Sequence, residues 1–446
     1  MSMSDHPKAY GTAAVAVAFV AGILITLGFK DFYPDLERRY QRRKGQPHNR
    51  TDSRPASTYL PVPPVKLEDH TRSARQSLVG LPVPEIPDGI EGCIGNTPLF
   101  KIKSLSEATG CVILAKAEFL NGAGGSPKDR VALNMIKMAE EEGFLTPGQG
   151  DTIYEGTVGS TGISLATLAR AKGYKAYICM PNDQSTEKSD LLHHLGATVE
   201  RVTPAPITST EHFVNLARTR AKEHTLSGKD ESKGFFADQF ESMANYRAHF
   251  QTTGPEIYEQ TGGHIDAFVA GAGTGGTISG IALFLKQEMG MGKDLKVFLA
   301  DPEGSGLYNK VKHGVMFSNT EKEGTRRRQQ VDTIVEGIGI NRLTENFEAG
   351  RELIDDAVKV TDLQALKMAR WLVEEDGIFV GSSSAVNCVA AVAAALKMPK
   401  GSRVVTILCD SGTRHLSKFW KKVGETGLED HEQADLIGFL GLKPSR

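Results

Sequence analysis

From residue 90 onward the chain alternates between runs typical of buried strands and runs typical of helices. Strand-like runs occupy Val112 to Glu118, Thr152 to Glu155 and Lys175 to Met180, and a helix-like run follows each of them. Parallel neighbours in a sheet need a crossover connection, which is usually a helix. The sequence therefore predicts an α/β fold with parallel sheets and helices on both faces.

A glycine-rich turn links one of these strands to the next helix. The segment Gly271-Ala272-Gly273-Thr274-Gly275-Gly276-Thr277 follows a strand-like run from Ile265 to Val269 and opens a helix-like run from Ile278 to Lys286. Backbone N–H groups without side chains at such a turn can surround a phosphate, and the two threonine hydroxyls add donors. The turn predicts a phosphate site.

Lys128 stands at the start of another helix-like run, in Ser126-Pro127-Lys128-Asp129-Arg130, after the glycine-rich stretch from Asn121 to Gly125. The positive end of the helix dipole and the neighbouring Arg130 are expected to lower the pKa of this lysine. An uncharged amine can attack a carbonyl and form a Schiff base. The alternative is a solvated surface lysine, which is what most lysines near helix starts are.

A third segment, Val404 to Gly412, predicts a buried strand that ends in the hydroxyl of Ser411. Taken alone, Ser411 reads as a strand-end cap. Together with a phosphate site and a Schiff-base lysine, it suits pyridoxal 5'-phosphate, because a neutral hydroxyl facing the pyridine nitrogen does not force that nitrogen to be protonated. A weaker electron sink of this kind favours elimination and β-replacement.

The glycine turn has a competing interpretation. Gly271-x-Gly273-x-x-Gly276 satisfies the dinucleotide fingerprint, and Asp301 follows a second strand at a suitable distance for a ribose-binding acid. Lys128 and Ser411 have no role in nicotinamide binding, so the oxidoreductase interpretation is the weaker one.

The order of these motifs resembles that in cysteine synthases, and the resemblance covers roughly residues 90 to 425. It is identified on eight motifs: Ile94-Gly95-Asn96-Thr97-Pro98-Leu99, Ser126 to Arg130, Thr157 to Gly162, Gln239-Phe240, Thr253-Gly254-Pro255-Glu256-Ile257, Gly273 to Thr277, Gly337-Ile338-Gly339 and Asp410-Ser411-Gly412. The chain is thus similar to the fold type II pyridoxal-phosphate enzymes that include cysteine synthase and cystathionine β-synthase.

This resemblance implies a catalytic domain over residues 90–430, with a smaller subdomain at about 126–235 and the cofactor in the cleft between two parallel-sheet subdomains. It implies Lys128 as the catalytic lysine. It also implies a cofactor site made by Lys128, Ser160, Gly273, Thr274, Gly275, Gly276, Thr277 and Ser411, and a substrate site made by Thr157, Gly159, Thr161 and Gln239. The expected reaction forms L-cysteine and acetate from O-acetyl-L-serine and sulfide through an aminoacrylate.

The substrate loop departs from the family pattern. Thr157-Val158-Gly159-Ser160-Thr161-Gly162 occupies the place of the usual Thr-Ser-Gly-Asn-Thr-Gly. Val158 removes a hydroxyl, and Ser160 is shorter than the asparagine that ordinarily reaches the cofactor's ring oxygen, so that bond is expected to be lost or mediated by water. Two alternatives to a cysteine synthase remain: a lyase that acts on cysteine or serine without replacement, and a cofactor-binding adaptor with little turnover.

Composition limits the partners. The chain has 446 residues and a formal net charge of −2, and its one short basic run, Arg326 to Arg328, favours a solvated loop over a nucleic-acid groove. The five cysteines are scattered without a CxxC pair, and His193 and His194 favour an exposed helix surface, so no metal site is predicted. We expect small-molecule substrates, no nucleic acid, and a homodimer.

The first ninety residues differ in composition from the α/β region that follows them. Gly11 to Phe29 is an uncharged run of 19 residues, which as a helix extends about 28 Å and predicts a transmembrane anchor. We expect a short tail at 1–10, the anchor at 11–29, a basic and Pro-rich tether at 30–89 and a C-terminal tail at 431–446. The basic residues after the run predict a catalytic domain facing the cytosol. They resemble the flank of mitochondrial outer-membrane signal anchors, with the endoplasmic reticulum as the alternative location.

Overall fold

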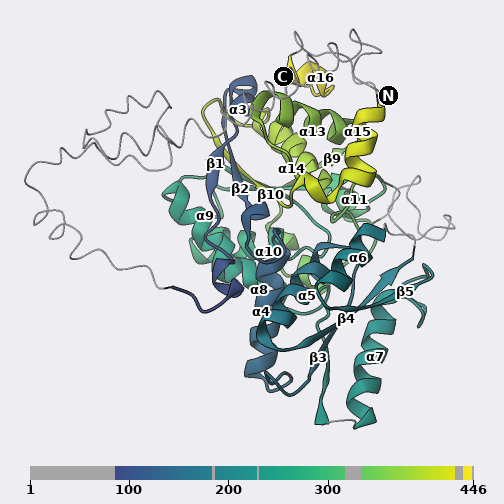
Figure 1. Ribbon diagram of the computed structural model, residues 1–446. Helices are drawn as coiled ribbons and strands as arrows, with labels where there is room; N and C mark the ends of the chain where they lie inside the picture. Colours follow the sequence, from purple (N-terminus) through teal and green to yellow (C-terminus); the bar gives the residue numbers. More distant parts are fainter. Residues whose placement is uncertain (1–85, 183–185, 229–230, 317–332, 427–434, 444–446) are drawn as a thin grey trace, which may run out of the picture. The chain divides into compact units, whose positions relative to one another are not determined.

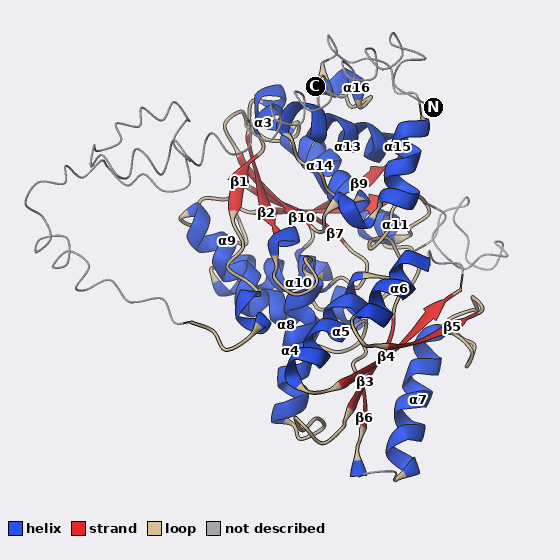
Figure 2. Ribbon diagram, in the orientation of Figure 1, coloured by secondary structure: helices blue, strands red, loops and turns tan. Residues whose placement is uncertain are grey.

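The computed structural model describes residues 86–182, 186–228, 231–316, 333–426 and 435–443, and these form two sheets with helices on both sides (Figures 1 and 2). The larger sheet has six strands in the order β1-β2-β10-β7-β8-β9. Its strands are β1 (Leu99–Lys101), β2 (Val112–Ala117), β7 (Ala267–Gly271), β8 (Lys296–Pro302), β9 (Asp356–Val360) and β10 (Arg403–Leu408). All neighbours are parallel except β1, which pairs antiparallel with β2 at the edge.

The smaller sheet has four strands in the order β5-β4-β3-β6, and all of its pairs are parallel. Its strands are β3 (Thr152–Gly156), β4 (Lys175–Pro181), β5 (Thr198–Val202) and β6 (Gly234–Phe236). Helices α4 (Lys128–Glu141), α5 (Ser160–Lys172), α6 (Thr186–His194) and α7 (Phe213–Ser227) connect or precede these strands. Each crossover between neighbouring strands therefore carries a helix, as the alternating sequence predicts.

The remaining helices belong to the larger sheet. They are α3 (Lys103–Thr109), α8 (Ala244–Ala248), α9 (Gly254–Thr261), α10 (Gly276–Ala282), α11 (Leu307–His313), α12 (Glu345–Glu348), α13 (Asp362–Asp376), α14 (Ser382–Ala395), α15 (Lys421–Glu425) and α16 (Leu436–Phe439). Short 3₁₀ turns lie at Ile90–Cys93, Glu118–Leu120, Arg351–Leu353 and Gly412–Arg414, and π-helical turns at His249–Thr253, Leu283–Glu288 and Leu416–Trp420.

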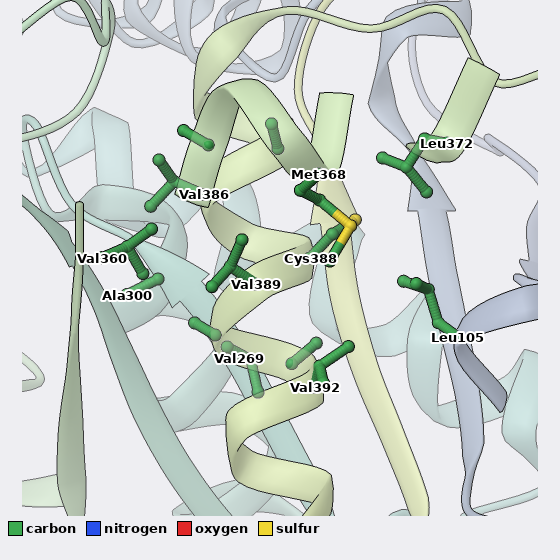
Figure 3. Packing of buried hydrophobic residues seen from close by; sticks show 14 of the residues in the cluster. Leu105, Val269, Ala300, Val360, Met368, Leu372, Val386, Cys388, Val389 and Val392 are labelled. Atoms are coloured by element: carbon green, nitrogen blue, oxygen red, sulfur yellow. The ribbon is translucent and has the colours of Figure 1, made fainter. Parts of the chain in front are cut away.

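The core of the larger sheet lies on both of its faces. On one face, α14 packs Val386, Val389 and Val392 against strand residues such as Val269, with α13 alongside it (Figure 3). Almost every residue of α14 is buried, which is the pattern of a helix enclosed by its neighbours rather than one at the surface. A second cluster, which includes Ile278 of α10, packs on the opposite face.

The smaller sheet is likewise covered on both faces. Helices α4 and α5 bury Ile136 and Ile163 in a cluster with Ile153 of β3. Tyr154 and Tyr177 stack with ring centroids 5.0 Å apart, and Tyr154 also contacts His224 of α7. An α/β fold with parallel-sheet subdomains is thus confirmed, whereas the boundary of the smaller subdomain at 126–235 stays a prediction.

Two predicted segments lie outside the described residues. They are the anchor at 11–29, with the tail before it and nearly all of its tether, and the solvated loop predicted at Arg326 to Arg328. Among the helices that the structure describes, none combines the length and the apolar character needed to cross a bilayer.

Candidate active site

Lys128 is the first residue of α4, directly after Pro127, whose backbone already has helical angles. Burial disfavours the charged amine and lowers the pKa of Lys128, and the nearby Cys409 and Asp410 oppose this shift without cancelling it. Its side-chain nitrogen makes no hydrogen bond within the described part of the chain. The amine is therefore available for chemistry.

The reason for the lowered pKa differs from the one that the sequence suggested. The guanidinium of Arg130 is bound on both sides by carboxylates, with Nη2 2.7 Å from Glu118 Oε1 and Nη1 2.6 Å from Glu256 Oε1. Its positive charge is thus largely neutralised. Desolvation, and not Arg130, lowers the pKa of Lys128.

Asp129 holds the backbone in front of Lys128. Its carboxylate accepts from the N–H of Gly124 at 2.7 Å and of Gly125 at 2.8 Å, and from Ser164 Oγ at 2.5 Å. Ser164 belongs to α5, so this one side chain ties the glycine approach to the helix of the substrate loop. Sequence reasoning missed it, although an acidic residue in the first turn of a helix is a common binder of free N–H groups.

The glycine turn between β7 and α10 leaves no room for side chains. A Cβ on Gly273 would lie 2.5 Å from Gly337 O, and one on Gly276 would lie 1.9 Å from Asn245 Oδ1. Gly275 has a φ of 86°, in the left-handed region that favours glycine. The turn therefore presents backbone N–H groups at the start of α10. Helix α10 continues without a break into the π-helical turn Leu283–Glu288.

The two threonine hydroxyls of the turn have partners behind them. Thr274 Oγ1 accepts from Asn245 Nδ2 at 2.9 Å, and Thr277 Oγ1 lies 3.1 Å from His249 Nε2. Burial lowers the pKa of His249 to about 3, so its ring is neutral at physiological pH. Since Thr274 accepts a hydrogen bond, its own hydrogen is free to be donated to an anion. Asn245 and His249 carry no motif of their own and were not predicted.

The strand expected to end at Ser411 is shorter: β10 ends at Leu408, and Ser411 follows three residues later as the cap of the turn Gly412–Arg414. Its Oγ accepts from Thr413 N at 3.3 Å and from Thr413 Oγ1 at 3.0 Å. Both acceptor positions are occupied in this arrangement, which leaves the hydroxyl hydrogen to be donated. The cap interpretation and the ring-nitrogen interpretation are therefore compatible.

The substrate loop runs from the end of β3 into α5. Gly159 is the N-cap residue of α5, and Ser160 is the first residue of the helix. The first N–H groups of any helix have no intrahelical partner and can bind a carboxylate. Thr157 Oγ1 accepts from Gly159 N at 3.4 Å, and Ser160 Oγ donates to Asp410 Oδ2 at 3.4 Å.

Gln239 lies behind this loop. Its Oε1 accepts from Thr161 Oγ1 at 2.6 Å, while its Nε2 lies 3.3 Å from both Glu155 Oε1 and Gly156 O. Glu155 is fully buried, and burial, reinforced by the charge of Asp238, raises its pKa to about 8. In this arrangement Gln239 positions Thr161 through its carbonyl.

Asp301, the acid of the dinucleotide interpretation, has partners within the fold. It lies in β8 with its side chain buried, and its Oδ2 accepts from Tyr308 N at 2.8 Å and lies 3.4 Å from Lys359 Nζ. The carboxylate thus helps to begin α11, which gives it a structural role.

Comparison with known proteins shows the family of this chain. Residues 90–410 match the model of the pyridoxal-phosphate dependent enzyme family. Cysteine synthase 2 of Neurospora crassa is 68% identical over 99% of both chains, and the Emericella nidulans protein of the same name is 61% identical over 95% of this chain and 96% of its own. Among solved structures, an O-ureido-L-serine synthase covers 79% of this chain and all of its own with a TM-score of 0.65 and 28% identity.

These comparisons correct the predicted location in the mitochondrial outer membrane. The relatives are named as cysteine synthases and not as membrane proteins, and one from Saccharomyces cerevisiae, 55% identical over 78% of this chain and 87% of its own, carries a provisional name as a mitochondrial cysteine synthase. Nor does any helix in the described ranges meet the requirements for a membrane span. The apolar composition of residues 11–29 led to the wrong location, because an uncharged Ala-rich run is weak evidence for an anchor.

The matched family model extends over most of the catalytic region, and the relatives share well over half of their residues with the chain across nearly its whole length. The chain therefore belongs to the family of pyridoxal-phosphate-dependent enzymes and, within it, to the cysteine synthases.

Proposed function

We propose that this chain is a pyridoxal-phosphate-dependent cysteine synthase that forms L-cysteine and acetate from O-acetyl-L-serine and sulfide. The observation that carries the proposal is the identity of 61–68% to cysteine synthase 2 proteins over 95–99% of the chain. The half-buried, unbonded amine of Lys128 supports it, because its pKa is lowered and such an amine can attack an aldehyde near neutral pH.

The residues present fit the cofactor. Glycine at positions 273, 275 and 276 lets the turn pack directly against Gly337, Phe347 and Asn245, and the backbone N–H groups of the turn at the start of α10 would bind the phosphate. Thr274 and Thr277 would donate their hydroxyls to the same group. Lys128 would hold the aldehyde carbon covalently, and Ser411 would donate its hydroxyl hydrogen to the pyridine nitrogen.

When bound, the cofactor supplies a conjugated ring that stabilises negative charge at the α-carbon of the amino-acid substrate. The amine of Lys128 would be the base that removes the α-proton of the amino-acid substrate. Burial favours this role, because it lowers the pKa of Lys128 and so keeps the amine uncharged. Departure of acetate and addition of sulfide at the β-carbon complete the replacement.

The substrate loop would bind the α-carboxylate. The N–H groups at the start of α5 and the hydroxyl of Thr157 would be the donors. The hydroxyl hydrogen of Thr161 is already donated to Gln239 Oε1, so Thr161 and Gln239 would support the loop from behind. We assign Ser160 to this loop rather than to the cofactor ring, because its hydroxyl is directed to Asp410.

A steady-state assay with O-acetyl-L-serine, serine and cysteine, each with and without sulfide, tests the proposal. Sulfide-dependent formation of cysteine from O-acetyl-L-serine, at a rate well above release of pyruvate, is the expected result. Pyruvate formation from cysteine or serine as the faster reaction would instead identify a lyase, and no turnover with any of the three would favour an adaptor. The predicted homodimer also remains a proposal, which sedimentation of the holoenzyme tests.

A further inference from the structure

A row of polar side chains connects α5 and α6, two helices of the smaller sheet, through residues that lie later in the sequence. Ser160 Oγ lies 3.4 Å from Asp410 Oδ2, which lies 3.1 Å from His415 Nε2. His415 Nδ1 lies 3.6 Å from Glu336 Oε2, which is too far for a hydrogen bond, and this nitrogen has no hydrogen-bond partner among the described residues. The same Glu336 oxygen accepts from Lys188 Nζ at 2.8 Å. Ser160 begins α5 and Lys188 lies in α6, so the row starts and ends on the smaller subdomain.

The middle of this row is buried and closely fitted. Asp410 and His415 are 7% and 6% exposed. A Cβ on Gly381 would lie 2.3 Å from Asp410 Oδ1 and 2.5 Å from His415 Nε2, so glycine is required beside them. The N–H of Gly381 also donates to Asp410 O at 3.0 Å. The backbone of the larger subdomain thus fixes this carboxylate–imidazole pair.

One oxygen of the Asp410 carboxylate lies in an energetically unfavourable environment. Its Oδ1 is buried and has no hydrogen-bond partner among the described residues, and leaving a buried acceptor unpaired is unfavourable. Although burial opposes ionisation, His415 and Arg414 outweigh it and lower the pKa of Asp410, so the carboxylate is charged. A charged side chain with an unpaired oxygen does not favour stability, so packing alone does not account for Asp410 at this position. Its other oxygen accepts from Ser160 in the substrate loop.

The outer end of the row is an ion pair between the two subdomains. Lys188 and Glu336 have side chains only 17% and 20% exposed, so solvent screens their attraction less than that of a surface pair. Lys418 lies 3.5 Å from the other oxygen of Glu336. The positive charges around Glu336 outweigh its burial and lower its pKa, which keeps it ionised.

We propose that Asp410, His415, Glu336 and Lys188 form a polar bridge that holds the substrate loop near its binding position before the amino acid arrives. In this role they are positioning residues for the α-carboxylate, acting through Ser160 and through the placement of α5 and α6. The proposal rests on the proposed cysteine synthase reaction. A loop that is already placed loses less conformational freedom on binding, so the bridge lowers KM and leaves kcat nearly unchanged.

The test compares Lys188→Met, Glu336→Gln and the double variant with Lys312→Met in the full-length holoenzyme. Lys312 is the matched control because its 2.6 Å ion pair with Asp356 lies within the larger subdomain. Hydrogen–deuterium exchange should rise at amides of α5 and α6 in the bridge variants and not in the control, and Lys188→Arg should restore protection. Unchanged exchange, or an equal rise in the control, would overturn the bridge.

Kinetics provide the second readout. The bridge variants should raise KM for O-acetyl-L-serine about three- to tenfold with kcat within twofold. The double variant should be no worse than the more severe single variant, because Lys188 and Glu336 are the two partners of one ion pair. A fall in kcat without a change in KM would contradict the positioning role. Exchange does not require turnover, so an enzyme that is inactive with O-acetyl-L-serine refutes the proposed function while the bridge is still tested.

Discussion

Asn245 Nδ2 donates to Thr274 Oγ1 over 2.9 Å, and the same nitrogen donates to Gln239 O over 2.8 Å. One buried amide therefore joins the glycine turn of the larger subdomain to the segment that supports the substrate loop. By accepting from Asn245, Thr274 keeps its own hydrogen for the phosphate. Asn245 thus links the orientation of the Thr274 hydroxyl to the segment that supports the substrate loop, and Asn346 Nδ2 shares the Gln239 carbonyl at 3.3 Å.

Replacement of Asn245 by aspartate should weaken cofactor binding. The change preserves the shape of the side chain but removes the donor and places a carboxylate beside the phosphate. We expect the dissociation constant for pyridoxal phosphate, measured by titration of the resolved enzyme, to rise at least about tenfold, or roughly 1.4 kcal/mol. Asn134→Asp is the control, because Asn134 donates to Ala244 O outside the turn. An equal effect in the control would refute the assignment.

Restoring the family's usual residues in the substrate loop tests whether the substrate preference of this enzyme differs from that of other cysteine synthases. Ser160→Asn, alone and with Val158→Ser, provides a longer donor and a further hydroxyl. For a cysteine synthase the double change should alter kcat/KM for O-acetyl-L-serine by about tenfold or less, which is about 1.4 kcal/mol of transition-state stabilisation. A much larger gain, together with loss of another activity, would show that the native loop is adapted to a different substrate.

The ion network behind Lys128 should be essential for stability. Glu118 is fully buried, and burial alone would raise its pKa, but Arg130 outweighs burial and lowers it. Arg130→Met leaves this carboxylate without its counter-charge, so the free energy of unfolding in urea should fall by about 3–5 kcal/mol. Arg220→Met, which breaks a half-exposed pair with Glu200, should cost less than about 1 kcal/mol. Similar losses in the two variants would contradict this account.

Because of Glu155, the free energy of unfolding should decrease as pH rises. Its folded-state pKa of about 8 lies above the ordinary value of 4.5, so between these values the folded protein binds more protons than the unfolded chain. The contribution of Glu155 to stability is therefore fully present below pH 4.5 and is lost as pH rises through 8, with a slope of up to about 1.4 kcal/mol per pH unit. Urea unfolding of the wild type and of Glu155→Gln should give curves that diverge over this range. Parallel curves would disprove the elevated pKa.

Local patterns predicted the framework of this site well. The expected strand at Thr152 to Glu155 is β3 (Thr152–Gly156), and the glycine turn lies between a strand and a helix as its sequence predicts. These features depend on periodicity and on backbone freedom, which neighbouring residues determine. Lys128 could be identified as the start of a helix for the same reason.

Contacts between distant residues could not be predicted. Arg130 and Glu256 are 126 positions apart, and Asn245 and Thr274 lie in different elements. Only the tertiary packing of the chain brings such pairs together, so the sequence attributed the pKa of Lys128 to its neighbour Arg130 when burial is the cause. Ser160 and Asp410, 250 positions apart, are a further example.

The identity of the lysine that binds the cofactor is the central claim. Reduction of the holoenzyme with borohydride fixes the cofactor to its lysine, and mass spectrometry of the digested protein then locates the label. We predict one pyridoxyl group, on the peptide that contains Lys128. Lys116 is a useful internal comparison, because it is more deeply buried than Lys128 and forms a 2.6 Å ion pair with Glu256. A label on Lys116 or on any other lysine, or no label at all, would contradict the account.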